Sequence, residues 1–357
     1  MAPGGALEVV DPGFDSVGLL REIDPGFEVR EAPLPGFSFP RFLPLRQARA
    51  GIARAALSVV GEDDLWRMHR AGAQPGGAES ATVLELKTEL ARRVIGRCRL
   101  CAHRCEVDRL SGQTGLCGLG PEATVAEHYV HIAEEPPINP SLVLNICGCG
   151  LHCRHCQQGA LLEPHLPDAS PLVARLWREL ETASCCARSV SFCGGNPDES
   201  LCAVLRFLLD APASWPLPII WNSHAYSTPE TLELLEGVVD AYVPDLKYSN
   251  PACAEQGCGA HDYPEAARQS IRAMLGQGVP VLVRILVLPD HFACCHAPIV
   301  DFLAEVNCEH LWVSVRGQYC PDWLITSTDG AMARRVRPEE VQTVRTRAIG
   351  LGLRLVE

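Results

Sequence analysis

The stretch ICGCGLHCRHCQQG, residues 146–159, holds four cysteines and two histidines. It follows an apolar run at 142–146 that has the character of a buried strand. Cys149, Cys153 and Cys156 have the spacing C-x3-C-x2-C. Three thiolates can hold three irons of a cubane iron–sulfur cluster and leave the fourth iron open for chemistry. The stretch therefore predicts a metal cluster at the end of a strand.

A second interpretation of this loop uses Cys147 as a fourth ligand. Four thiolates would close the site completely, as a structural zinc or a closed cluster requires. Cys147 lies only two residues before Cys149, at the strand end, so we favour the three-cysteine interpretation. The closed site remains the alternative and would describe a non-catalytic iron–sulfur or zinc protein.

From residue 141 onward, apolar runs alternate with amphipathic segments. The pattern predicts strands at 142–146, 189–193, 218–221, 238–243, 279–288 and 311–315. It predicts helices at 172–182, 199–209, 229–236, 264–275, 298–306 and 338–348. Successive βα units imply a parallel sheet with right-handed crossovers. We therefore expect an α/β fold over residues 141–357; periodicity alone does not decide between a barrel and an open sheet.

Polar segments follow most of these strands. They are the cysteine loop, Gly194-Gly195-Asn196, Asn222-Ser223-His224, Asp245-Leu246-Lys247 and Gln318-Tyr319. Because the carboxyl ends of parallel strands meet at one edge, a functional site is expected there.

Composition excludes some classes of partner. A net charge of −12 argues against phosphate neutralisation on a nucleic acid. No run of eighteen apolar residues occurs, and the first residues lack a signal-peptide pattern, so we expect a cytoplasmic protein without a membrane span. Eighteen cysteines in such a chain favour metal binding over disulfides.

With its flanking strand and βα series, CGLHCRHC resembles the radical S-adenosylmethionine superfamily. The resemblance runs from about Glu85 to the C-terminus and is strongest to the pyruvate formate-lyase activating enzyme-like branch. FCGGNP is similar to that branch's GGEP turn, IIWNSHAY to WNSNGY, YVPDLKY to YLPDFKY, VRILVLPDH to RHLVLPG and QYCP to QYxP.

The resemblance implies a partial (β/α)6 TIM-like barrel over residues 141–357. It also implies a [4Fe-4S] cluster that cleaves S-adenosylmethionine reductively to a 5′-deoxyadenosyl radical, which abstracts hydrogen from a substrate. It implies an electron donor such as flavodoxin or ferredoxin, and a target such as a glycine of a glycyl radical enzyme. A peptide or a small molecule is the alternative target. The residues it assigns to the cofactor are His155, Gly194, Gly195, Asn196, Asn222, Ser223, Asp245 and Arg284, with Asp245 and Lys247 as the candidate catalytic pair.

Three positions depart from the branch. Asn196 stands where an acid is usual, and His224 and Ala225 stand where Asn and Gly are usual. The first departure puts a side-chain contact to the cofactor in doubt, but not the contacts of the two glycine backbones.

A second cysteine motif lies upstream. Cys98, Cys101, Cys105 and Cys117 have the spacing C-x2-C-x3-C-x11-C. Four thiolates suit a structural zinc or an auxiliary four-iron cluster. Because the motif precedes the first barrel strand, we expect a metal-binding knuckle over residues 91–140 that stabilises the fold and has no route to the substrate.

Residues 1–90 are expected to form a Pro/Gly-rich, loop-rich extension. Pro-Gly-Phe recurs at Pro12, Pro25 and Pro35, each time as a turn followed by an aromatic anchor. A helix is predicted at 81–95, where apolar residues recur at helical spacing.

Overall fold

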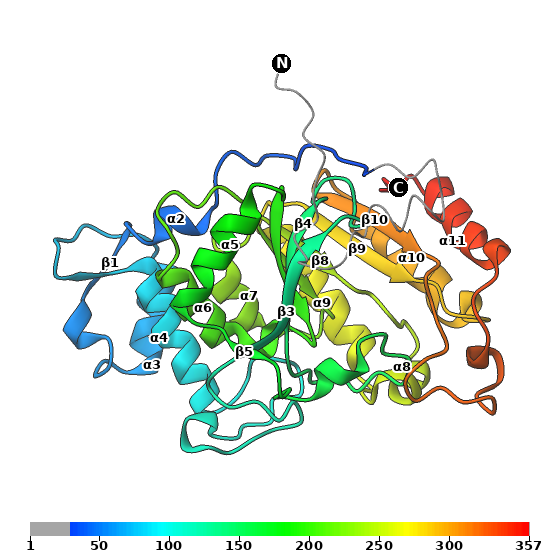
Figure 1. The fold of residues 1–357 in the computed structure, drawn as a ribbon, viewed down its shortest axis with the longest axis horizontal. Helices are drawn as coiled ribbons and strands as arrows, with labels where there is room; N and C mark the ends of the chain where they lie inside the picture. Colours follow the sequence, from blue (N-terminus) through cyan, green and yellow to red (C-terminus); the bar gives the residue numbers. More distant parts are fainter. Residues whose placement is uncertain (1–28, 357) are drawn as a thin grey trace.

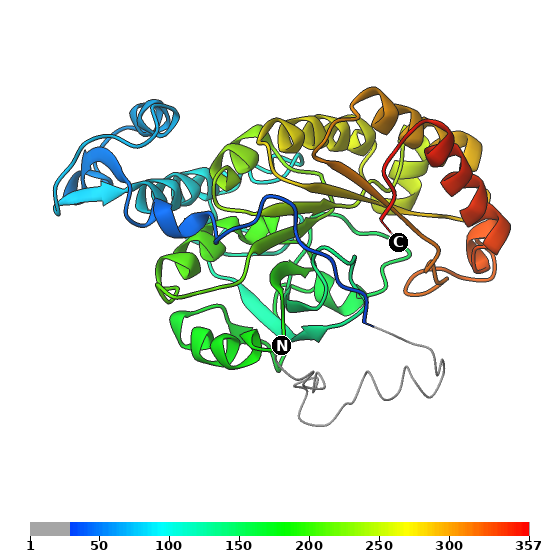
Figure 2. The ribbon, with the colours of Figure 1, turned by 90° about the horizontal axis from the view of Figure 1, so that it is seen from above.

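The computed structural model describes residues 29–356. Its main sheet has the strand order β10-β9-β8-β7-β6-β4-β3-β5, in which the six strands from β10 to β4 are parallel. The parallel strands are β4 (Ser141–Ile146), β6 (Ser189–Gly194), β7 (Ile219–Ser223), β8 (Ala241–Pro244), β9 (Val281–Leu286) and β10 (Leu311–Arg316). The sheet is curved but not closed, because its end strands β10 and β5 do not pair (Figure 2). The predicted partial barrel is confirmed.

Two antiparallel strands, which the sequence did not predict, extend the sheet beyond β4. They are β3 (Thr124–His131) and β5 (Ser170–Pro171). All residues of β4 are buried, as expected for a strand covered on both faces. By contrast, only Val125 and Val130 of β3 are buried, and the strand carries polar side chains such as Glu127 and Tyr129. Because its polarity is mixed, a search for apolar runs did not identify this strand.

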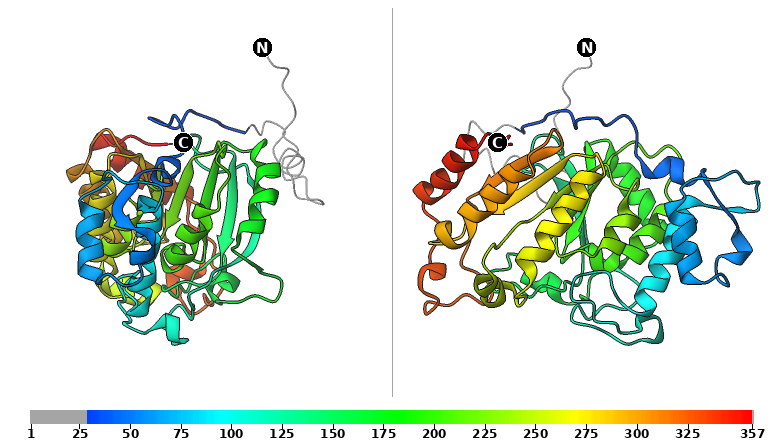
Figure 3. Two further views of the ribbon diagram at one scale, coloured as in Figure 1. Left: turned by 90° about the vertical axis from the view of Figure 1, so that its left-hand side faces the viewer. Right: turned by 180° about the vertical axis from the view of Figure 1, so that it is seen from behind.

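Helices connect the parallel strands and cover the outer side of the sheet (Figures 1 and 3). They are α5 (Trp177–Ser184), α6 (Leu201–Leu209), α7 (Pro229–Leu235), α8 (Pro251–Cys258), α9 (Tyr263–Gly276), α10 (Ala297–Glu305) and α11 (Pro338–Gly350). All but α8 were predicted. Asn250 caps α8 by accepting hydrogen bonds from the N–H groups of Ala252 and Cys253. An Asn-Pro pair is therefore the start signal that was overlooked.

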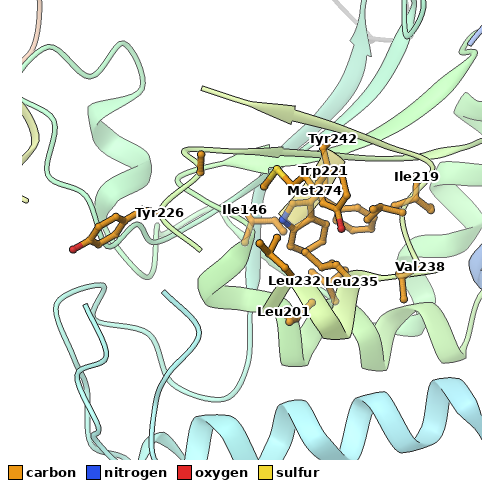
Figure 4. Packing of buried hydrophobic residues seen from close by; sticks show 14 of the residues in the cluster. Ile146, Leu201, Ile219, Trp221, Tyr226, Leu232, Leu235, Val238, Tyr242 and Met274 are labelled. Atoms are coloured by element: carbon orange, nitrogen blue, oxygen red, sulfur yellow. The ribbon is translucent and has the colours of Figure 1, made fainter. Parts of the chain in front are cut away.

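The core lies between the strands and these helices. Figure 4 shows Trp221 of β7 near Leu232 and Leu235 of α7 and Met274 of α9. All four are buried. One apolar cluster runs from Phe42 to Leu353, so the segments before the barrel share its core. The expected domain boundaries at residues 90 and 140 remain a prediction.

The segment before the barrel contains α2 (Phe42–Leu45), a two-stranded sheet of β1 (Arg49–Ala53) and β2 (Ser80–Thr82), α3 (Glu62–Arg70) and α4 (Val83–Gly96). The predicted helix at 81–95 corresponds to α4. Thr82 and Glu85 form a capping box that fixes its start. Figure 2 shows β1 and α3 projecting from the body of the molecule.

Residues 29–40 cross the amino ends of the strands (Figures 1 and 3). The N–H of Ala32 donates to the carbonyl of Pro136, and the Asn139 side chain donates to the carbonyl of Arg30, both at 2.8 Å. Leu34 packs on a small apolar cluster within the barrel, formed by Ile138, Ile220, Ala241, Val243 and Leu282. The segment thereby closes this end of the barrel.

The predicted Pro-Gly-Phe turns at Pro12 and Pro25 lie outside the described residues. The third repeat is a turn, in which the N–H of Phe37 donates to the carbonyl of Leu34 and Gly36 has φ +73°. No helix within residues 29–356 is both long enough and apolar enough to cross a membrane.

Trp221→Phe should lower the free energy of unfolding by about 1–3 kcal/mol. The indole Nε1 donates to Oδ1 of buried Asp198 at 2.7 Å, so phenylalanine removes one partner of a carboxylate that water cannot reach. Urea unfolding at 25 °C measures the change. The control is Trp323→Phe, because Trp323 is 48% exposed. Equal losses in the two variants would contradict the role of this hydrogen bond.

Candidate cofactor and metal site

One cavity of about 290 Å³ opens at the carboxyl ends of the strands. Every residue predicted for the cluster or for the cofactor pocket lines it. These are Cys149, Cys153, His155, Cys156, Gly194, Gly195, Asn196, Asn222, Ser223, Asp245, Lys247 and Arg284. The structure thus brings together side chains from five strand ends. Their roles remain predictions.

The cysteine loop is held by the turn after β6. The N–H of Gly195 donates to the carbonyl of Ile146 at 2.7 Å, and the N–H of Asn196 donates to that of Gly148 at 2.9 Å. A Cβ on Gly194 would lie 2.4 Å from the Ile146 nitrogen, and one on Gly195 would lie 2.3 Å from the Gly148 oxygen. Gly194 also has φ +105°. Only glycine allows this approach, so the pair does more than form a tight turn.

Cys147 differs from the other three cysteines of the loop. Its side chain is fully buried, and its N–H donates to the carbonyl of Thr124 at 3.0 Å. The described residues around the cavity include Cys149, Cys153 and Cys156 but not Cys147. The cavity therefore offers three thiols from this loop.

A neutral ring and an ion pair flank these thiols. Burial and the Lys247 cation lower the pKa of His155 to about 4, so its ring is neutral at pH 7. The ring centroid of Tyr319 lies 5.7 Å from that of His155. Lys247 Nζ donates to Asp245 Oδ2 at 2.5 Å. Burial alone would lower the pKa of Lys247, but the Asp245 carboxylate raises it above the ordinary value for lysine.

The inner wall of the cavity carries an ionic cluster that the sequence analysis missed. Arg284 donates to both oxygens of Glu135, at 2.8 Å and 2.6 Å, and also contacts Glu134. Arg316 reaches Glu135 at 2.8 Å. The two guanidinium groups hold the pKa of Glu135 well below its ordinary value, although burial opposes them. Glu134 and Glu135 lie in the β3–β4 connection, which no motif indicated.

Asn196 and His224, the two polar departures from the resembling branch, contact each other both directly and through Glu199. Asn196 Nδ2 donates to Glu199 Oε2 at 2.5 Å, and Asn196 Oδ1 accepts from the N–H of His224 at 3.1 Å. His224 Nε2 lies 3.2 Å from Glu199 Oε1. The three side chains are buried. The neighbouring His224 and Asn196 lower the pKa of Glu199 against the effect of its burial. Asn196 and His224 thus form one network with a carboxylate that the sequence analysis did not single out.

The upstream cysteines line a second, smaller cavity. Cys98, Cys101, Cys105 and Cys117 all face it, together with Gly150 and Glu199. His103 Nε2 lies 2.8 Å from the carbonyl of Gly150, whose N–H donates to Glu199 Oε1 at 2.9 Å. Gly150 belongs to the first cysteine loop. The upstream motif therefore lies next to the main cavity. Its position before the first barrel strand in the sequence had suggested a greater distance from the cavity.

A third group of metal-ligand side chains lies outside both cysteine motifs. Within residues 29–356, the set of three ligand atoms that lie within 4.8 Å of one another belongs to Cys253, His291 and Cys294.

Fold and site define an α/β partial-barrel protein with two adjacent cysteine motifs at the carboxyl edge of its sheet. The chain is 30% identical over 266 residues to the uncharacterized protein MJ0674 of Methanocaldococcus jannaschii, which is 73% of this chain and 76% of that protein. It belongs to the same family as MJ0674. No established family profile matches the sequence.

Among solved structures, Streptococcus suis SuiB bound to S-adenosylmethionine is similar at 17% identity and a TM-score of 0.41. The alignment covers 58% of this chain and 47% of SuiB. SuiB bound to the precursor peptide SuiA gives 16% identity and a TM-score of 0.42, over 58% and 46% of the two chains. The chain thus spans less than half the length of SuiB.

Glu135→Gln should lower the free energy of unfolding by about 1.5–3 kcal/mol near pH 7, because the partly exposed Arg284 and Arg316 lose their hydrogen bonds to a buried, charged partner. The folded pKa of Glu135 is depressed, so its stabilising effect is present above the unfolded pKa of about 4.3 and declines as the pH falls below it. Urea unfolding of both proteins between pH 7 and pH 3.5 should show the difference shrinking.

The matched control is Glu31→Gln. Glu31 contacts Arg188 at 2.7 Å with both side chains partly exposed, so its loss should cost less than about 1 kcal/mol. A difference between wild type and Glu135→Gln that did not change with pH would contradict the ionic role of Glu135.

Proposed function

We propose that this protein is a radical S-adenosylmethionine enzyme. Cys149, Cys153 and Cys156 would hold a [4Fe-4S] cluster, and the cavity beside them would hold S-adenosylmethionine. The observation that carries the proposal is the shared cavity. Three thiols, a two-glycine turn and polar side chains from successive strand ends all line it. The residues fit the cofactor, since a cluster with an open iron needs three thiolates and a neighbouring ligand pocket.

Held by Cys149, Cys153 and Cys156, the cluster would supply one-electron reduction of S-adenosylmethionine and, through it, hydrogen-atom abstraction from the substrate. The chain's own residues would bind the cofactor and orient it. Asn222, Ser223 and Asp245 offer an amide, a hydroxyl and a carboxylate to the polar ends of the cofactor. The neutral ring of His155 offers a flat face beside the thiols. Leu151, Leu162 and Leu286 supply apolar wall that limits water around a radical.

The cofactor contact of the two-glycine turn would run through its backbone. The side chain of Asn196 is already bonded to Glu199 and His224, so it is not placed like the acid of related sequences. Arg284 is likewise held by Glu134 and Glu135. We propose that Arg284 sets the charge of the inner wall, and that it reaches the cofactor only if this ion pair opens.

We propose a protein substrate, specifically a glycine Cα–H in a glycyl radical enzyme, with reduction by a flavodoxin or ferredoxin. Support comes from the resemblance of YVPDLKY, whose Asp245 and Lys247 form an ion pair at the cavity. A glycyl radical signal in electron paramagnetic resonance, formed on a candidate partner enzyme, tests the target. Cofactor cleavage without that signal would move the substrate to a peptide or a small molecule.

Cys149→Ala, Cys153→Ala and Cys156→Ala should each abolish 5′-deoxyadenosine formation, because each removes a thiolate from the cavity. Cys147→Ala should retain most of the activity and iron, since Cys147 does not line the cavity. Anaerobic reconstitution, iron analysis and product chromatography measure this. If Cys147→Ala alone destroyed the cluster, the site would be closed and the protein would be a non-catalytic metal binder.

We propose further that Cys98, Cys101, Cys105 and Cys117 hold a second iron–sulfur cluster. All four thiols line one small cavity, and the Arg109 guanidinium lies 3.9 Å from the Cys98 sulfur, where it would stabilise a thiolate. Burial raises the pKa of Cys101, and of Cys117 to about 11, so cluster binding would displace protons from these thiols.

Reconstituted wild-type protein should contain about eight irons, and Cys101→Ala about four. Cys101→Ala should also lower the melting temperature, because a bound metal adds directly to folding free energy. About four irons in the wild type, with one zinc that is lost in Cys101→Ala, would instead assign the upstream motif to zinc. Four irons without zinc would remove the metal from this motif altogether.

A further inference from the structure

A third group of soft ligands lies outside both cysteine motifs. Cys253 is in the first turn of α8, while His291 and Cys294 belong to the turn that follows β9. Their ligand atoms all lie within 4.8 Å of one another, and the Cys253 and Cys294 sulfurs are 3.9 Å apart. That separation is close to the roughly 3.8 Å between two sulfurs on one tetrahedral zinc. The ligand atoms are already positioned for a single ion.

The local backbone explains how two ligands come from so short a segment. Residues Phe292–His296 form a π-helical turn, in which the N–H groups of Cys295 and His296 both donate to the carbonyl of His291. π-Helical turns are rare and often occur at functional sites. Asn250 caps α8 and fixes Cys253 from the other side, since its side chain accepts from the N–H of Cys253 at 3.2 Å.

The tautomer of His291 suits a metal ligand. Its Nδ1 lies 2.7 Å from the carbonyl oxygen of Pro289. A carbonyl can only accept, so Nδ1 carries the proton and Nε2 keeps its lone pair. A metal-binding histidine characteristically donates its other ring N–H to a carbonyl or carboxylate in this way. This contact is independent of the short distances among the three ligands.

Access is also compatible with an exchangeable ion. Cys253, His291 and Cys294 are all partly exposed, whereas the neighbouring Cys295 is fully buried.

We propose that Cys253, His291 and Cys294 form a site for one divalent cation of the zinc class, with a fourth coordination position left for water. The ion would tie the start of α8 to the turn after β9. Both segments follow strands whose ends line the main cavity, through Asp245 and Leu286. The site does not depend on the proposed radical chemistry, and it would stabilise one rim of the cavity whatever reaction occurs there.

The test is residue-specific alkylation of the reduced, full-length protein with and without Zn²⁺, followed by peptide mapping. Mapping distinguishes these thiols from the other cysteines of the chain. Zinc should slow alkylation of Cys253 and Cys294 at least about tenfold, since a bound thiolate is withheld from the reagent. The exposed Cys308 should be unaffected.

His291→Gln should abolish most of this protection while leaving both thiols in place. Cys253→Ser/Cys294→Ser should bind one zinc fewer per chain by native mass spectrometry. The matched control is Cys185→Ser/Cys186→Ser, which removes two other neighbouring thiols, 3.4 Å apart, and should keep the zinc count of the wild type. An unchanged iron content in each variant would show that it still folds.

Equal alkylation rates with and without Zn²⁺ would overturn the proposal. Protection that survived in His291→Gln would also overturn it, because two thiols alone would then account for binding. Neither result would bear on cofactor cleavage, which is measured separately.

Discussion

The close backbone contact between the two strand-end loops is the constraint on which the site depends. Gly194 and Gly195 let the turn after β6 lie directly against the cysteine loop after β4, where any Cβ would meet backbone atoms at 2.3–2.4 Å. The hydrogen bonds that close this contact run from Gly195 and Asn196 to Ile146 and Gly148. Since β4 and β6 are neighbours in the sheet, the strand register itself sets the position of the cysteines.

A second layer of contacts joins the two cysteine motifs into one unit. Gly150 is bonded through its carbonyl to His103 of the upstream segment, and through its N–H to Glu199. Glu199 also bonds Asn196 and His224. A change at one cysteine motif would therefore alter the other, because a few buried hydrogen bonds connect them. The polar departures from the family pattern act as a set and not as isolated substitutions.

Much of this arrangement could be predicted from the sequence, because apolar periodicity and strand-end polarity are local signals. The parallel strands and all their helices but α8 followed from such signals, and so did the cysteines of the loop, whereas the resemblance named the other predicted residues that line the cavity. The backbone conformation of Ala225 also agrees with the pattern of the resembling branch. It has φ +60°, a conformation that favours the glycine usual at this place in the resembling branch.

What could not be predicted depends on contacts between distant segments. Arg284 could be named from its strand, but its pairing with Glu134 and Glu135 requires the β3–β4 connection to fold into the barrel. Cys253 and Cys294 lie 41 residues apart, and no spacing rule links them. The partly polar strand β3 was likewise invisible to a search for apolar runs.

The closure of the barrel by residues 29–40 has a consequence for how molecules reach the cavity. Leu34 and the apolar cluster beneath it seal the amino ends of the strands, and the pairs of Arg284 and Arg316 with Glu135 lie at the inner wall. Among the described residues, side chains of the barrel itself therefore separate the cavity from the amino ends of the strands. Two molecules that entered the cavity from the carboxyl edge would bind in a fixed order, the deeper one first.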